Sequence, residues 1–366
     1  MQAPTPGQHR LVVRSIGSAA PAIQRAIVQA LRLPKDDVLR RLYQAPSVLL
    51  DGIAEPLGEQ LSGVLSEAGL ETEVLPMDAP FTPGVGDREV ALHVGDPARL
   101  REVVAVVARF LGSDAAGAAQ VLRSAPAVLV GQVSIATVEA LRAQLAPLGV
   151  ELDVSVGGQS RYDLFLGPCE PGVRSLAARV LRALGVEAQP EGPLLALNLD
   201  RATADRVWAQ LQPRAPVRLI DQAFQRFAIR LEEAPDTPEV RALLVAQTGM
   251  PAAVAPRVLS RLPIVLHQGA RHTDVPALLS ALAEVGARAT AQLLTFLTFD
   301  LVVEQVTDRA RAVDVVAAMT GHDAATVSQS LRALPARLEG PFNQTWALWM
   351  QAELRAAGVR ASLEER

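Results

Sequence analysis

Apolar and polar residues alternate along five short segments that are spread through the chain. In one of them Val90, Leu92 and Val94 point to one side, and the residues between them point to the other. Alternation with a period of two residues is typical of a β-strand, and such a strand is expected to bury one face only. The five predicted strands are 11–17, 89–95, 161–167, 226–232 and 298–304.

Each alternating segment is followed by apolar positions that have the spacing of a helix. After the second strand, Leu100, Val103, Val104 and Val107 form one stripe, which predicts a helix over 98–112. A helix with one apolar stripe buries that stripe against a neighbouring element. We therefore expect this helix to cover the strand that precedes it.

Proline, serine and glycine mark the limits of the next elements. A second helix, over 114–126, ends at Pro126, because the residue before a proline is disfavoured in helical conformation. A short strand follows, and Ser134 is positioned to cap a third helix that ends at Gly149. A final alternating strand, 150–155, completes the order β-α-α-β-α-β.

This order returns along the chain, and repeats of this size indicate a tandem architecture. We predict an α+β fold of about five small units, each a small sheet covered on one face by helices. The third unit is degenerate, because its second helix and proline are missing, and residues 77–87, rich in Pro and Gly, are expected to form a flexible linker. The proline of the second unit has counterparts in Pro46, Pro263 and Pro335. The predicted units are 10–76, 88–156, 160–221, 225–294 and 297–364.

Composition and charge narrow the possible classes of protein. The chain has 366 residues, a net charge of −4 and one cysteine, and aromatic residues make up 4% of it. A mildly acidic chain lacks the basic footprint of a dedicated nucleic-acid binder, and one cysteine forms no internal disulfide. Residues 1–10 do not resemble a secretory signal, and no apolar run approaches the roughly 18 residues of a membrane span. We expect a cytoplasmic protein without membrane insertion, metal or cofactor.

The second unit resembles a known domain. Residues 125–154, APAVLVGQVSIATVEALRAQLAPLGVELDV, are similar to the C-terminal domain of the bacterial ribosomal stalk protein of the large subunit. The shared pattern is A-P-x-x-(L/V)-x-x-x-V-S, then (A/V)-E-A-L-x-x-x-L, then G-(V/A)-x-(L/V)-x-V. The resemblance covers the whole of the second unit. It covers the first, fourth and fifth units only at the residues that mark the limits of their elements, and the third unit only at its ends. The Clp protease adaptor shares this kind of fold, so the resemblance implies a fold and a recognition role for helix surfaces.

The stalk domain recruits translation GTPases through basic and apolar residues on its first two helices. The resemblance places Leu100, Arg101 and Val104 at matching positions, which makes them candidates for contact with a partner. The lysines of that family's surface are missing, because Lys35 is the only lysine in this chain.

The tryptophans are further candidates for partner contact, since Trp is enriched at interfaces. Trp346 and Trp349 are one helical turn apart and share a face, and Trp208 falls one place after a core position. Packing in the core or between units is the simpler interpretation of Trp346 and Trp349. The sequence leaves both interpretations open.

Signals for catalysis are weak. His267 and His272 lie in one glycine-containing loop, but a metal site needs three or four ligands, and a surface loop is the simpler interpretation. Cys169 precedes a helix, where the pKa of a thiol can fall, yet no base is near it in sequence. The glycine motifs that bind phosphates or dinucleotides are also missing.

We therefore expect a non-enzymatic adaptor or scaffold that binds one or more proteins. Several weak docking sites on one chain raise the overall affinity through effective concentration. The alternative is a ribosome- or translation-factor-associated protein that uses the stalk-like domains to recruit a GTPase. A basic patch with an apolar centre on the first two helices of a unit would favour this alternative, and mixed-charge faces would favour another partner.

Overall fold

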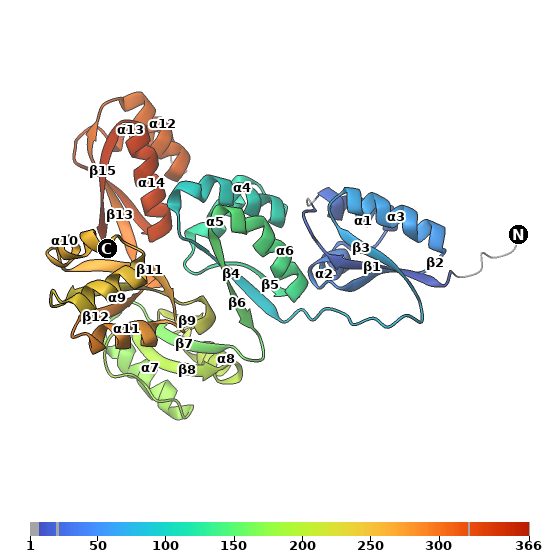
Figure 1. Ribbon diagram of the computed structural model, residues 1–366, viewed down its shortest axis with the longest axis horizontal. Coiled ribbons are helices and arrows are strands. Elements are labelled where there is room, and N and C mark those ends of the chain that lie inside the picture. The colour runs from blue at the N-terminus through green and yellow to red at the C-terminus, as the bar shows by residue number, and fades with distance from the viewer. Residues whose placement is uncertain (1–6, 20–21, 321–322, 366) are drawn as a thin grey trace, which may run out of the picture. The chain divides into compact units, whose positions relative to one another are not determined.

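The computed structural model describes residues 7–19, 22–320 and 323–365. The chain forms two compact units, one ending at Gly157 and the other beginning at Gly158. The described residues form five three-stranded sheets, two in the first unit and three in the second. The predicted α+β fold of small repeated units is confirmed (Figure 1).

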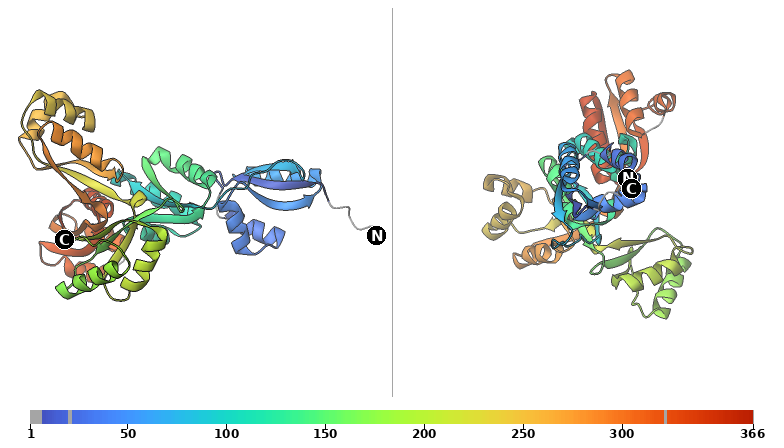
Figure 2. Two further views of the ribbon diagram at one scale, coloured as in Figure 1. Left: turned by 90° about the horizontal axis from the view of Figure 1, so that it is seen from below. Right: turned by 90° about the vertical axis from the view of Figure 1, so that its right-hand side faces the viewer.

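All five sheets share one topology. The first strand of each repeat lies in the centre, and the second and third strands pair with it from either side in antiparallel direction. The two outer strands therefore run parallel to each other, and the last helix of the repeat connects them. Within each repeat the helices lie on one face of the sheet, as the views in Figures 1 and 2 show.

The first unit contains two complete repeats, both with the predicted order. The elements of the first repeat are β1 (His9–Ser15), α1 (Ala22–Leu31), α2 (Lys35–Tyr43), β2 (Ser47–Ile53), α3 (Glu55–Glu67) and β3 (Glu71–Pro76). The elements of the second are β4 (Arg88–Val94), η1 (Pro97–Arg99), α4 (Leu100–Leu111), α5 (Ala115–Arg123), β5 (Ala127–Val133), α6 (Ile135–Leu145), η2 (Ala146–Leu148) and β6 (Val150–Val156).

The second unit contains three repeats, and the first of them lacks the second helix, as predicted. That repeat consists of β7 (Arg161–Leu166), α7 (Pro171–Ala183), β8 (Leu194–Asp200), α8 (Arg201–Leu211) and β9 (Val217–Asp221). After the short turn η3 (Gln222–Phe224), the fourth repeat consists of β10 (Arg226–Glu233), α9 (Pro238–Thr248), η4 (Ala252–Val254), α10 (Ala255–Leu259), β11 (Ile264–Arg271), α11 (Val275–Glu284) and β12 (Arg288–Leu293). After η5 (Leu294–Phe296), the fifth consists of β13 (Thr298–Val306), α12 (Arg309–Thr320), α13 (Ala324–Ser330), β14 (Ala336–Asn343), α14 (Gln344–Ala356) and β15 (Val359–Glu365).

The predicted start of α6 is confirmed, whereas the helix ends at Leu145 and the turn η2 carries the chain on to Gly149. The hydroxyl of Ser134 accepts a hydrogen bond from the backbone N–H of Thr137 at 3.4 Å, which satisfies one of the free N–H groups at the start of the helix. Asp200 and Asn343 cap the equivalent helices of the third and fifth repeats. Gly149 has a φ of 65°, a left-handed conformation that favours glycine.

The second strand of four repeats carries a β-bulge near its start, at the second or third residue of the strand. In the first repeat Val12 pairs with Val48 and Leu11 pairs with Leu50, so one extra residue, Leu49, lies between the two pairs. The corresponding extra residues in the second, third and fourth repeats are Leu129, Leu195 and Leu266. The extra leucine is buried in the first three of these repeats and packs against the core in the fourth, and in the first repeat the carbonyl oxygens of Val48 and Leu49 lie on the outer edge of the strand, where both accept from Arg41.

Both faces of each sheet are buried at its centre, which corrects the expectation that the first strand buries one face only. In the first repeat the second face is covered by Phe81, whose ring lies 5.3 Å from the guanidinium of Arg10 and 5.9 Å from that of Arg14. Sequence alternation misses this cover, because it comes from a segment outside the repeat. The central residues that face away from the helices are Val12 (0% exposed), Ala91 (1%), Asp163 (2%), Ala228 (4%) and Asp300 (3%).

Candidate interaction surfaces

The three contact residues predicted on α4 differ in exposure. Leu100 is 1% exposed and belongs to the core of its repeat, whereas Arg101 is exposed and Val104 is half-buried. Leu100 opens α4 directly after η1 and is the first residue of the apolar stripe that covers the sheet. The expectation that Leu100 contacts a partner is therefore corrected: its side chain packs the repeat, while Arg101 and Val104 remain at the surface.

The two tryptophans of α14 pack against each other. Their ring centroids are 4.8 Å apart with the planes at 62°, an edge-to-face arrangement. Trp346 is 3% exposed, so the structure supports packing rather than partner contact for this residue. Trp349 is half-buried, and its Nε1 donates to a carboxylate oxygen of Glu353 at 3.1 Å. The i to i+4 bond fixes the exposed edge of Trp349 on the helix.

Trp208 is the most exposed tryptophan in the chain. It lies on α8 and is 40% exposed, directly after the buried Val207. A large apolar ring that is left half in water remains a candidate anchor for a partner.

The residues considered for catalysis lie in different elements of the second unit. The expected surface loop is corrected for His267, which lies in the strand β11. Its Nε2 is buried without a hydrogen-bond partner, and burial lowers its pKa from the ordinary value. His272 lies beyond the strand, with its ring 6.0 Å from that of Phe227. Across the part of the chain that the structure describes, no three His, Cys, Asp or Glu residues gather as metal ligands. Cys169 is exposed in the second unit, and Lys35 is exposed at the start of α2 in the first.

An apolar groove of about 120 Å³ lies between α1 and α3 in the first repeat. We call it the α1–α3 groove. Every residue that lines it is Ala, Ile, Leu or Val, including Ile27 and Leu31 of α1 and Leu61 and Val64 of α3. Val64 is 58% exposed, so the groove opens to solvent along α3. An aliphatic surface in contact with water favours association with another apolar surface.

A second groove, of about 520 Å³, lies in the fourth repeat between α10 and the edge of β11, and we call it the α10–β11 groove. Its apolar residues include Val254 and Val265, which are 40% and 45% exposed. Arg257 and Arg261 also line it. The two grooves therefore differ in chemistry, one wholly aliphatic and the other with an apolar floor and two cationic side chains.

Sequence reasoning did not find either groove. The signal for the α1–α3 groove is that apolar residues on α3 extend beyond the buried stripe, with Leu57 49% and Val64 58% exposed. The signal for the α10–β11 groove is the pair Arg257 and Arg261, one helical turn apart on either side of Val258. Both sequence patterns indicate a groove only when the distance between the neighbouring elements is known.

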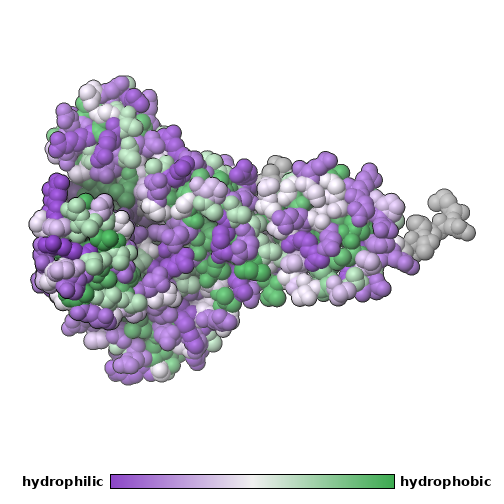
Figure 3. All heavy atoms as spheres, in the orientation of Figure 1, coloured by the Kyte–Doolittle hydropathy of each residue, from purple (hydrophilic) through white to green (hydrophobic). Residues whose placement is uncertain are grey.

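The visible surface mixes hydrophilic and hydrophobic residues in both units (Figure 3). None of the helices that could be assessed is long and apolar enough to cross a membrane. Comparison with known protein families, with curated proteins and with solved structures found no match to this chain.

Proposed function

We propose that this chain is a non-enzymatic adaptor or scaffold of the cytoplasm, whose repeats offer unlike docking surfaces to one or more proteins. The two grooves and the exposed ring of Trp208 lie on three different repeats. Several modest sites on one chain raise the overall affinity for a multivalent partner. The stalk-domain resemblance of the second repeat, which implies recognition by helix surfaces, agrees with this proposal.

The α1–α3 groove is the observation that carries the proposal. Two helices of one repeat expose a trough of aliphatic side chains, and about 25 cal/mol is gained for each Å² of apolar area that a partner removes from water. A groove between helices fits the apolar face of a third helix. Val64 marks its open side, because it lines the groove and is 58% exposed.

One observation favours the alternative function, recruitment of a translation GTPase. The α10–β11 groove combines Arg257 and Arg261 with an apolar centre beside the second helix of its repeat. A stalk-like unit is expected to have a basic patch with an apolar centre on its first two helices, and Arg257 lies on the second of these helices. Elongation factors or ribosomal proteins that co-purify with the chain, and are lost when residues 225–294 are deleted, would favour this function over a general scaffold.

Affinity purification of the tagged full chain from its own cells tests the proposal, with mass spectrometry of the proteins that co-purify. The Val64→Glu variant places a carboxylate in the groove, and we expect its main partner to bind at least about 30-fold more weakly, the size of a hot-spot loss. Folding stability should change by no more than about 0.5 kcal/mol, because Val64 is mostly exposed.

Gly63→Glu is the matched control. Gly63 is the neighbouring exposed residue of α3, and a Cβ at this position would meet no atom within 4 Å. The control adds the same charge to the same helix without lining the groove. Recovery of the same partners with Val64→Glu as with Gly63→Glu would exclude the groove, and the lack of any reproducible partner would overturn the proposed function.

A further inference from the structure

The first and fourth repeats differ in whether a side chain covers the outer edge of the second strand. In the first repeat Arg41 of α2 donates from Nη1 to the carbonyl oxygens of Val48 and Leu49, at 3.1 and 2.8 Å. These are the two carbonyl groups that the bulge leaves on the outer edge of β2. A side chain of the repeat itself thus forms hydrogen bonds with the carbonyl oxygens of this edge and covers it. Proteins commonly protect edge strands by covering them.

The fourth repeat has the same bulge but lacks the arginine. Arg41 stands five residues before Pro46, and the residue five before Pro263 is Val258. Val258 lines the α10–β11 groove beside Val265 and Leu266, whose carbonyl groups correspond to those covered in the first repeat. Within the described ranges no side chain donates a hydrogen bond to either carbonyl oxygen. β11 is also an outer strand of its sheet, and Ile264, Val265 and Leu266 of this strand line the groove.

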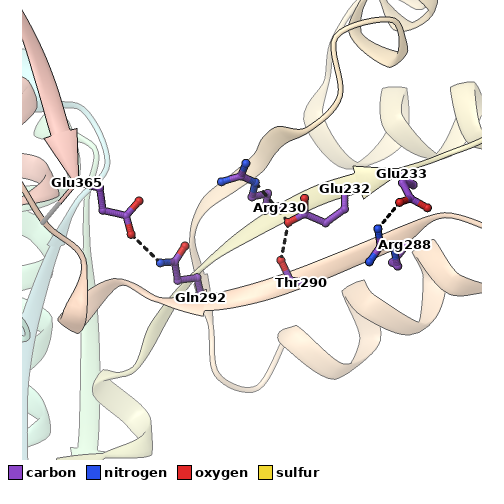
Figure 4. Close-up of polar contacts among 7 residues, drawn as sticks. All are labelled: Arg230, Glu232, Glu233, Arg288, Thr290, Gln292 and Glu365. Carbon is purple, nitrogen blue, oxygen red and sulfur yellow. Dashed lines mark hydrogen bonds and ion pairs between the residues drawn. The ribbon is translucent and has the colours of Figure 1, made fainter. Parts of the chain in front are cut away.

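The two arginines of the groove have no carboxylate partner among the described residues. Other cations of the same repeat are paired: Arg241 bonds Asp236 at 2.6 Å, Arg230 lies 3.3 Å from Glu232, and Arg288 bonds Glu233. Figure 4 shows the last two pairs on the side of the sheet formed by β10 and β12. Arg257 and Arg261 therefore place unbalanced positive charge along one edge of the sheet only.

We propose that the α10–β11 groove binds an extended segment of a partner protein in which an aliphatic side chain is flanked by Asp or Glu. The backbone N–H groups of the segment donate to the carbonyl oxygens of Val265 and Leu266. The aliphatic side chain packs on Val258 and Val265, and the acidic side chains pair with Arg257 and Arg261. This inference rests on the proposed adaptor function and gives one of its sites a ligand class.

Selection of random 12-residue peptides displayed on phage, with the full chain as bait, tests the ligand class. We expect the enriched sequences to contain an aliphatic residue within a few positions of two or more Asp or Glu. A synthetic peptide of the consensus sequence is then measured by fluorescence anisotropy. Enrichment of basic or uncharged sequences, or of none, would overturn the proposal.

Three variants assign the binding to the groove. Arg257→Glu with Arg261→Glu should weaken the consensus peptide at least about tenfold, because two attractions become repulsions. Arg179→Glu with Arg182→Glu on α7 is the matched control, since both of these arginines are exposed and unpaired among the described residues, and affinity should not change. Equal losses in the two double variants would indicate nonspecific attraction of acidic peptides and would contradict the groove.

The Val258→Arg variant distinguishes binding to the strand edge from attraction by positive charge alone. This substitution restores the arginine of the first repeat, so it covers the two carbonyl oxygens and fills the groove while it adds positive charge. The proposal expects weaker binding, whereas attraction by charge alone would give tighter binding and would overturn it.

Sedimentation of the full chain tests whether the groove binds a second copy of the chain instead. A dimer that is lost in the Arg257→Glu, Arg261→Glu variant would assign the groove to that second copy and would overturn the proposal. Val64→Glu leaves this groove untouched, so failure here is distinguishable from failure of the adaptor function.

Discussion

Asp163 shows how a single polar residue on a strand joins two repeats. Its carboxylate is 2% exposed and accepts hydrogen bonds from Nε2 of Gln222 at 2.8 Å and Nε2 of Gln225 at 2.9 Å. The backbone N–H of Asn198 donates to it as well, at 2.8 Å. The glutamines lie in and after the turn η3, so the carboxylate fixes the connection to the next repeat against the sheet.

We expect Asp163→Ala to destabilise the protein by about 2 kcal/mol, because the buried amide of Gln225 and the half-buried amide of Gln222 lose their acceptor. Asp163→Asn keeps one acceptor oxygen and should lose less. The measurement is urea unfolding of the full chain, followed by circular dichroism.

The control for this substitution is Asp314→Ala on α12, an exposed position of the same unit. A surface substitution of this kind should stay within about 0.5 kcal/mol. Similar losses for Asp163→Ala and Asp314→Ala would show that the buried hydrogen bonds contribute little.

At the residue scale, the sequence predicts those features that depend only on neighbouring residues in the chain. Ser134 and Gly149 are identifiable because a helix cap and a left-handed residue each depend on their immediate neighbours. Asp163 is not identifiable in this way. The period-2 pattern places it on the face away from the helices, and the glutamines that cover it are about 60 residues further along the chain.

At the scale of elements, protection of the outer strand edges depends on one position of the second helix. Arg41 fulfils this role in the first repeat, and a valine holds the same position in the second and fourth repeats, as Val121 and Val258. An arginine covers exposed carbonyl groups, and a valine leaves them open. The repeats thus share a fold and differ in which edges are available.

We expect Arg41→Ala to expose the edge of β2. Two hydrogen bonds to carbonyl oxygens are lost, which costs about 1 kcal/mol because water replaces them. An uncovered edge also offers a template for pairing with another chain. Analytical ultracentrifugation at rising concentration should therefore show more self-association than for the unsubstituted chain.

Arg40→Ala is the control for the edge. Arg40 is the preceding residue of α2 and bonds Asp37 at 2.7 Å in an exposed i, i+3 pair. Such pairs contribute little to stability, so neither unfolding nor association should change by a measurable amount. Equal self-association of the two variants would indicate that positive charge on α2, and not the covering of the β2 edge by Arg41, prevents the chains from associating.

The order and type of the elements could be predicted from alternation and helical spacing, since these follow from which face is buried. The grooves could not be predicted. A stripe of apolar residues on α3 predicts that the helix packs, but not that a trough remains beside α1. The distance between two helices is set by all the side chains between them, and residues such as Leu50 and Leu61 contribute from different elements.

At the scale of the whole molecule, the chain consists of two compact units that each contain buried apolar residues of their own. One core in the second unit surrounds Leu164 and Leu195, and another surrounds Ile229 and Leu244. A segment with its own core is able to fold by itself.

We expect residues 1–157 and 158–366 to fold when they are produced separately. The sum of their circular dichroism spectra should match the spectrum of the full chain, and each piece should unfold cooperatively in urea. A division after Gly95 is the control, because it separates β4 from β5 and β6 of one sheet. Pieces from this control should not fold, and an unfolded 1–157 or 158–366 would contradict the expected independence.

Lys35 and Cys169 give each compact unit one chemically unique side chain. The only lysine of the chain is exposed in the first unit, and the only cysteine is exposed in the second. Once the N-terminal amine is blocked, an amine-reactive donor dye and a thiol-reactive acceptor dye can therefore be directed to side chains of different units without any substitution. Resonance energy transfer between the dyes would then follow the separation of the units in solution, and a partner that bridges both units would change the transfer efficiency as it binds.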